Sequence, residues 1–465
     1  MKTLPFFVCA AALLTSCAVG PDYHRPDTAT LTPTEWTWKP AEPQDQLPKG
    51  DWWNIFNDPV LAGLETNTIA GNQTLRAAVA RVDQGRAAAR LTRGQFFPEL
   101  SLDPAASRQR VSGNEPIPFP FKLKPVYLNT YSAPIDLSYE VDLWGRVRRS
   151  FESIRAEAQI SAADYQNVLL TLTADVAVNY FLLRSIDADI AVQRRSIELH
   201  RQSIDILKGR VSAGAIPELD LAREQTELAS GQAILEDTLR QRAETVDALT
   251  LLVGKPVGAL VISETNFPTA PPLVPVGLPS SVLERRPDVA AAERALASKN
   301  AQIGVARAAW FPVVRLTGQA GYLSGDIQKL FTGDSFTWSL GPSVSLPLFT
   351  GGRTAATVKQ SKSAYEEALA NYRQAALNAF KEVGDSLAQI NFWGRQADAQ
   401  RDALTSARHV TELTKARCDA GVLSTFELLA AQRAELEFQR EDAQLAGRRF
   451  AATIRLVKSL GGGWN

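Results

Sequence analysis

The chain has 465 residues, in which 50 lysines and arginines balance 50 aspartates and glutamates, so the formal net charge is zero. This balance gives no basic field that would attract nucleic acid or an acidic substrate. Three cysteines and three histidines, scattered along the chain, are too few to predict a metal site or a disulfide framework. We therefore predict no metal and no cofactor, and either two or three ordinary domains or one duplicated one.

The N-terminus reads as a secretory leader. A lysine precedes an apolar run over residues 4–14, which ends in Leu-Thr-Ser-Cys17. The run is shorter than the about 20 residues that cross a bilayer, so we interpret residues 1–16 as a signal peptide, with an ordinary cleaved leader or a short membrane helix as alternatives. The pattern resembles the bacterial lipoprotein signal, which implies an acylated Cys17 anchored in outer-membrane lipid. Ala18 resembles the signal for forwarding to the outer membrane.

Residues 17–58 are rich in proline, threonine and tryptophan and show little periodicity, which predicts an extended arm laid over a surface. Pro59 suits the first position of a helix. Helical stretches are predicted from there to about residue 71 and over 73–94.

Four segments alternate apolar and polar residues with the period of two that is typical of strands. They lie at about 98–111, 127–141, 312–323 and 336–349, and they predict two hairpins. A soluble sandwich is one interpretation, but the leader, the strand length and the terminal aromatic residues favour strands that cross an outer membrane. Four strands cannot close a barrel, which needs about eight or more. Other subunits must therefore pair the open edges, and an oligomer is predicted.

Two long segments free of proline, 147–216 and 353–420, predict helical rods. In the first, an apolar residue recurs at every seventh position from Leu169 to Val211, the pattern of a coiled coil or long bundle. At about 1.5 Å per residue, such a rod is on the order of 100 Å long. Each rod ends near a glycine, Gly214 or Gly421, as helix C-termini often do, and an amphipathic helix returns. We predict two helical hairpins.

The hairpin tips are copies of each other. Residues 210–225, RVSAGAIPELDLAREQ, are matched 207 residues later by 417–432, RCDAGVLSTFELLAAQ. The chain is therefore an internal duplication of a unit of roughly 200 residues. We place repeat 1 at 59–253, a linker at 254–284 and repeat 2 at 285–465.

Residues 278–293 read LPSSVLERRPDVAAAE. Together with the leader, both tips and the strand entries Phe97-Pro98 and Phe311-Pro312, this segment resembles the outer membrane factor family, the TolC- and OprM-like exit ducts of tripartite efflux pumps, in its lipoprotein branch. The resemblance covers essentially the whole mature chain. It implies a mixed, mainly α fold in a homotrimer, with a twelve-stranded outer-membrane barrel and a periplasmic α-barrel of helical hairpins.

The resemblance also implies the function and the partners. Such a duct exports small molecules such as drugs, and it works with a periplasmic adaptor and an inner-membrane pump. No phosphate loop, nucleophile with a base, or metal cluster is recognisable, so we predict no enzyme activity. Two alternatives stay open, namely a duct for type I protein secretion and a non-conducting coiled-coil lipoprotein that tethers the envelope. The tether gives no reason for the four strands.

Site residues follow from the tip motif. The resemblance implies a periplasmic gate after Gly421, in which Phe426 forms an apolar constriction and Glu427 an acidic ring of three. A solvated residue on the helix face is the alternative interpretation of Glu427. The aspartate that the family often has three positions later is replaced by Ala430, which leaves the strength of the ring open.

The adaptor is expected to dock at both tips, where small residues allow a partner helix to approach the backbone. The docking residues are Gly214, Ala215, Ile216, Gly421, Val422 and Leu423. A simple helix-capping role for the two glycines is compatible with docking. Because the tips diverge after the glycine, we expect the second hairpin to gate and the first mainly to support it.

Overall fold

The computed structural model describes residues 18–26, 50–112, 126–265, 270–272 and 285–462. The chain divides into two compact units, unit 1 (Met1–Pro26, Arg81–Ser161, Ala292–Tyr372) and unit 2 (Asp27–Ala80, Ala162–Ala291, Arg373–Asn465). The predicted signal peptide, Cys17, much of the predicted arm and part of the linker lie outside the described residues. Acylation of Cys17 therefore stays a prediction.

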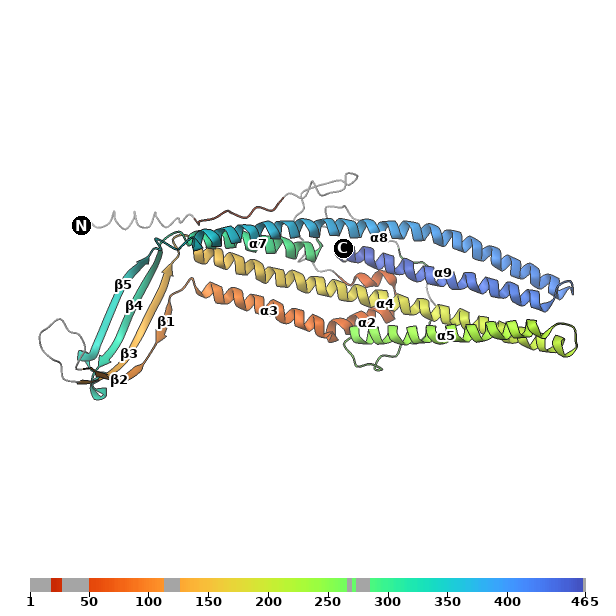
Figure 1. Cartoon of the computed structure of the whole chain (residues 1–465), viewed down its shortest axis with the longest axis horizontal. Helices are drawn as coiled ribbons and strands as arrows, with labels where there is room; N and C mark the ends of the chain where they lie inside the picture. The colour runs from red at the N-terminus through yellow and green to blue at the C-terminus, as the bar shows by residue number, and fades with distance from the viewer. Residues whose placement is uncertain (1–17, 27–49, 113–125, 266–269, 273–284, 463–465) are drawn as a thin grey trace. The chain divides into compact units, whose positions relative to one another are not determined.

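Unit 1 contains one antiparallel sheet (Figure 1). Its strands are β1 (Glu99–Leu102), β2 (Ala105–Val111), β3 (Val126–Val141), β4 (Val313–Ser324) and β5 (Phe336–Ser345). The order is β1-β3-β4-β5, and β2 continues β1 along the same edge of β3. The sheet is thus four strands wide, and its two edges are β1 with β2, and β5.

The first predicted strand is interrupted, and the last is shorter than predicted. Pro104 separates β1 from β2 because proline has no amide hydrogen to donate to the ladder. The Asp103 amide still donates to the Pro134 carbonyl at 3.2 Å, so both pieces keep β3 as their partner. Similarly, β5 ends at Ser345, shortly before Pro347, whereas the sequence pattern predicts a strand to residue 349.

The helices follow the duplication. Their bounds are α2 (Pro59–Gly71), α3 (Gln73–Gly94), α4 (Arg146–Ser212), α5 (Glu218–Leu252), α7 (Pro287–Ala308), α8 (Arg353–Asp419) and α9 (Thr425–Ser459). Both α4 and α8 have 67 residues, and both α5 and α9 have 35. Helix α8 starts 207 residues after α4 starts, and α9 starts 207 residues after α5 starts. Figure 1 shows α5 returning beside α4, and α9 beside α8, as the two predicted hairpins.

The core of unit 2 lies where a short 3-10 helix, η2 (Trp52–Phe56), and α2 pack on the long helices. Trp52 and Trp53 are both buried there, so this end of the predicted extended arm is helical and belongs to the core. The Trp52 indole donates to Thr173 Oγ1 at 3.2 Å, and Phe181 of α4 stacks on Phe450 of α9 with ring centroids 4.3 Å apart. Aromatic packing of this kind contributes beyond simple area burial and joins the two repeats in one core.

Candidate functional site

The two faces of the sheet differ sharply in polarity. The register aligns Leu137, Gly318 and Leu340 on one face, and the next aligned row on that face is Ile135, Ala320 and Trp338. Trp338 is 69% exposed and Leu340 is 62% exposed. An apolar sheet face that a single chain leaves uncovered is the kind of surface that contacts lipid or another protein.

The opposite face is polar and internally paired. Asp136 accepts a hydrogen bond from the Gln319 amide at 2.9 Å. Farther along, Glu140 binds Arg146 through two hydrogen bonds of 2.6 and 2.9 Å, and Arg315 lies 4.0 Å from the same carboxylate. Alternation of an apolar and a polar face is the pattern of strands that separate lipid from a water-filled interior.

The strand-to-helix junction of repeat 1 explains the motif Asp142-Leu-Trp-Gly-Arg. The Asp142 carboxylate accepts from the amides of Val147 and Arg148 at 3.1 and 2.9 Å, so it caps the first turn of α4. Gly145 has a φ of 80°, and Trp144 stacks on Phe311 of the other repeat with centroids 4.7 Å apart. The motif therefore ends a strand, starts a helix and joins the repeats.

Both hairpin tips have the same backbone geometry. At the first, Gly214 has a φ of 65°, and Ala215 N donates to Arg210 O at 2.9 Å. At the second, Gly421 has a φ of 72°, and Val422 N donates to Arg417 O at 2.9 Å. Each is a Schellman motif, in which a left-handed residue lets the chain turn after the helix. The equivalent atoms are 207 residues apart.

The tips differ in how the returning helix starts. Pro217 precedes α5 and provides no side-chain cap. Ser424 precedes α9 and forms a capping box with Glu427, because Glu427 N donates to Ser424 Oγ and Ser424 N donates to Glu427 Oε2 at 2.8 Å. Glu427 is exposed, and Phe426 beside it is half-buried. Glu427 is therefore a structural cap on an exposed surface, a role that neither sequence interpretation anticipated.

The predicted docking residues lie at the turns themselves. Gly214, Ala215, Gly421 and Val422 are exposed, and Val422 is 71% exposed. Ile216 and Leu423 are half-buried. Among the described residues, no hydrogen bond or ion pair connects the first turn to the second, so the predicted site residues form two separate groups, each on its own turn.

The hairpins are connected instead by a polar cluster around the buried Glu224, which the sequence does not indicate. Arg433 of α9 donates to Glu224 of α5 at 2.7 Å, and His200 Nδ1 of α4 lies 2.9 Å from the same Glu224 oxygen. Burial favours the neutral carboxyl, but the hydrogen bonds from His200 and Arg433 outweigh this and lower the pKa of Glu224. No local pattern marks these residues, because 209 positions separate Glu224 from Arg433.

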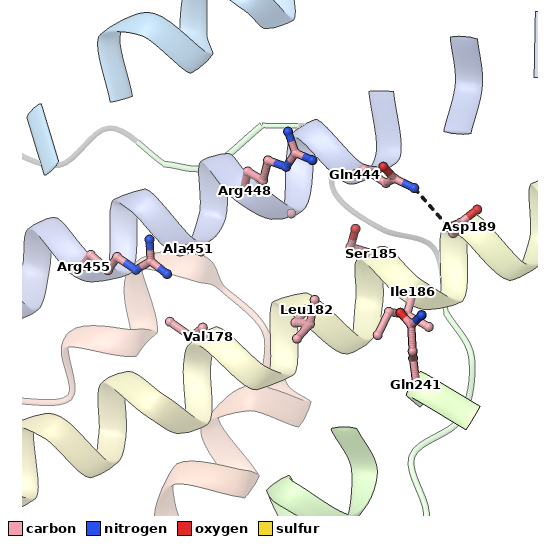
Figure 2. A pocket seen from close by; sticks show the side chains of 11 residues that line it. Val178, Leu182, Ser185, Ile186, Asp189, Gln241, Gln444, Arg448, Ala451 and Arg455 are labelled. Carbon is pink, nitrogen blue, oxygen red and sulfur yellow. Dashed lines mark hydrogen bonds between the residues drawn. The ribbon is translucent and has the colours of Figure 1, made fainter. Parts of the chain in front are cut away.

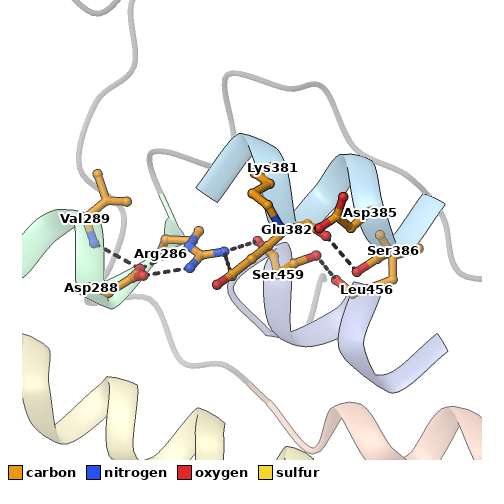
Figure 3. Close-up of polar contacts among 9 residues, drawn as sticks. All are labelled: Arg286, Asp288, Val289, Lys381, Glu382, Asp385, Ser386, Leu456 and Ser459. Atoms are coloured by element: carbon orange, nitrogen blue, oxygen red, sulfur yellow. Dashed lines mark hydrogen bonds and ion pairs between the residues drawn. The ribbon is translucent and has the colours of Figure 1, made fainter. Parts of the chain in front are cut away.

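The Arg-Pro-Asp segment forms a second such cluster (Figure 3). Arg286 holds Asp288 through two hydrogen bonds of 2.6 and 3.0 Å, in the bidentate geometry that suits guanidinium and carboxylate. Burial of Asp288 opposes its charge, but Arg286 outweighs this and lowers the pKa of Asp288. The motif thus has a structural role at the start of α7.

Comparison with known proteins gives full-length matches. The family model described as outer membrane efflux protein matches residues 65–255 and 278–462. The chain is 32% identical over 486 residues to the toluene efflux pump outer membrane protein TtgF of Pseudomonas putida, and the match covers 100% of this chain and 98% of that protein. It is 33% identical over 477 residues to the pyoverdine export outer membrane protein OpmQ of Pseudomonas aeruginosa, with 100% and 97% covered.

Solved structures agree with these matches. The outer-membrane channel OprN superposes with a TM-score of 0.86 at 29% identity, over 96% of this chain and 100% of that chain. The open state of the Neisseria gonorrhoeae MtrE outer membrane channel gives a TM-score of 0.83 at 27% identity, over 96% and 98%.

Proposed function

The chain belongs to the outer membrane efflux protein family, and from this premise we propose that three copies form one exit duct through the outer membrane and the periplasm. The family consists of outer-membrane channels rather than enzymes, and we propose no covalent chemistry for the chain. Its energy must then come from partners, an inner-membrane pump and a periplasmic adaptor.

The open sheet is the observation that supports a trimer. Each copy supplies a sheet four strands wide with an exposed apolar face. A transmembrane sheet must satisfy all its backbone groups, so β5 of one copy has to pair with β1 and β2 of the next. Three sheets of this width close a twelve-stranded barrel, with the apolar face toward lipid and the polar face toward the lumen.

We assign the gate and the docking surface to the tips. Phe426 and Glu427 of three copies would surround the periplasmic entrance, where an apolar ring and an acidic ring can restrict passage. The turns at Gly214 and Gly421 would receive the adaptor, and their exposure and their open space for a partner backbone support this assignment. We also propose that Cys17 is acylated and holds the mature N-terminus at the membrane.

The cargo is proposed from the relatives. TtgF is named for toluene efflux and OpmQ for pyoverdine export, and small organic molecules are the class that these names share. A deletion strain tests this cargo against the alternative, protein secretion. We expect greater susceptibility to toxic small molecules with unchanged protein in the culture medium. Unchanged susceptibility together with the loss of a secreted protein would instead favour the type I secretion duct.

A further inference from the structure

A groove of about 360 Å³ runs along the contact between α4 and α9 in unit 2 (Figure 2). Its apolar floor includes Leu182 and Ile186 of α4 and Ala451 of α9. The two helices approach closely beside it, since a Cβ added to Gly447 would lie 2.7 Å from Ser185 Oγ. The groove therefore depends on small residues of α9 at this contact.

Two arginines give the groove a positive charge. Arg448 and Arg455 both line it from α9, and seven residues place them on one helix face about 10 Å apart along the axis. Both are exposed, and within the described parts of the chain neither guanidinium group has a hydrogen bond or an ion pair. Two cations beside an apolar floor are complementary to an anion with an apolar body.

The carboxylate that lines the groove does not cancel this charge. Asp189 is already held by Arg440 Nε at 2.9 Å and by Gln444 at 3.2 Å. Gln193 donates to it as well, at 2.9 Å. Because the Asp189 charge is compensated by Arg440, the positive charge of Arg448 and Arg455 is left in excess.

The groove lies on the side of α4 that faces away from η2 and α2. Thr173 and Tyr180 make the hydrogen bonds to Trp52 and Asp58 in that layer. At about 100° of rotation per residue, they lie roughly opposite Leu182 on the helix. In the proposed trimer the helices form the wall of a tube. A further layer on the inner side of this wall would fill the lumen, so the side of α4 that η2 and α2 cover must face outward. The groove, on the opposite side of α4, then faces the lumen.

We propose that this groove is a lumenal binding site for small amphiphilic anions in transit, with Arg448 and Arg455 binding the anionic group and Leu182 and Ile186 the apolar body. The inference rests on the proposed function, because only the assembled trimer has a lumen. Three copies place six such guanidinium groups around it. The site would favour organic carboxylates and sulfonates over neutral or cationic compounds.

Current through purified trimers in a planar bilayer tests the site, with 2-naphthalenesulfonate as the probe and the 2-naphthylmethylammonium ion as its cationic counterpart. We expect the sulfonate to produce transient blockades and the cation to produce none. Replacing both arginines in R448Q/R455Q should shorten the mean blockade at least tenfold. R448K/R455K, which keeps the charge, should retain most of it, and R449Q is the matched control on the same helix.

A second variant tests the site without removing either arginine. A451F fills the groove and leaves both arginines in place, and it should also shorten the blockade. Size-exclusion chromatography verifies that each variant is a trimer. Equal blockade by the two probes, or blockade unchanged in both R448Q/R455Q and A451F, would overturn the inference while leaving the channel intact. Trimers that carry no current even when Phe426→Ala widens the gate would overturn the proposed function and this site together.

Discussion

Arg286 donates to Glu382 Oε2 across 2.6 Å, although 96 residues separate them in sequence. The same nitrogen reaches the Ser459 carbonyl at 3.2 Å. One guanidinium group, 8% exposed, thus connects the start of α7 to the middle of α8 and the end of α9. The Arg-Pro-Asp segment, which is the most recognisable part of the family's sequence, therefore holds three helices together.

Replacing Arg286 by methionine should destabilise the protein by about 2 kcal/mol. The change leaves Asp288 without its partner, and the cost is below the ~3–5 kcal/mol of a fully buried pair because Asp288 is 35% exposed. Thermal unfolding followed by circular dichroism measures it. Lys381→Met, which removes an exposed pair on α8, is the control and should leave the midpoint nearly unchanged.

The destabilisation should depend on pH with a defined sign. The pKa of Asp288 is lowered in the folded protein from its ordinary value of 3.8, so the pair stabilises the fold above pH 3.8 and the benefit is lost as the pH falls through the lower folded pKa. The difference between wild type and R286M should therefore shrink as the pH falls below 3.8 toward the lower folded pKa. A difference that grows toward low pH would contradict the assigned role.

The lipid-facing assignment of the sheet is tested by two adjacent positions of β5. Leu340→Arg places a charge on the apolar face, which costs about 2–4 kcal/mol near the bilayer midplane, and trimers in the outer-membrane fraction should decrease strongly. Ser339→Arg places the same charge on the polar face and should leave trimer yield close to wild type. Equal loss in both variants would mean that the apolar face does not contact lipid.

The capping box separates two roles of Glu427. The E427Q variant should keep the helix start, because glutamine serves at this position of a capping box as glutamate does, and it removes only the charge. We expect E427Q to lower cation preference in the reversal potential across a KCl gradient, and Phe426→Ala to raise conductance. Ser424→Ala removes the cap at a cost of about 1 kcal/mol and should leave selectivity unchanged. If E427Q keeps the wild-type reversal potential, Glu427 caps the helix and does not set ion selectivity.

A bulky side chain introduced at Gly421 tests whether the adaptor docks at the second tip. An added Cβ meets no atom within 4 Å, but the φ of 72° strains any side chain. Gly421→Trp should leave trimers intact and abolish efflux, because the indole occupies the space that the partner needs. Gly421→Ala has the strain without the bulk and should retain most efflux. Normal efflux from the tryptophan variant would remove Gly421 from the docking surface.

Regular features of the fold could be predicted from sequence. The seven-residue stripe from Leu169 to Val211 predicts one long helix, and α4 spans it without a break. The glycines at the tips predict the helix ends, since left-handed geometry there strongly favours glycine. Pro104 and Pro347, in contrast, lie where strands end. The apolar–polar alternation continues in the residues around them, so the alternation alone did not predict these ends.

Contacts between distant segments could not be predicted in the same way. Nothing local to His200 or Arg433 indicates that they share Glu224, and a single sequence carries no record of which helix faces meet. Glu65 is a further case, because a glutamate in a helix is ordinarily solvated. It is fully buried, no described residue hydrogen-bonds its carboxyl oxygens, and burial raises its pKa to about 9. Burial thus favours the neutral form of this carboxyl, and no residue next to Glu65 in the sequence indicates it.

The central claim, that three copies enclose one continuous duct, is tested most directly by purified protein whose mass has been determined and which is then inserted into a planar bilayer. We predict a complex with three times the mass of the mature chain and discrete current steps of uniform size, one for each insertion. A monomer, or a trimer that inserts without current even when Phe426→Ala widens the gate, would contradict the duct and favour the tethering lipoprotein.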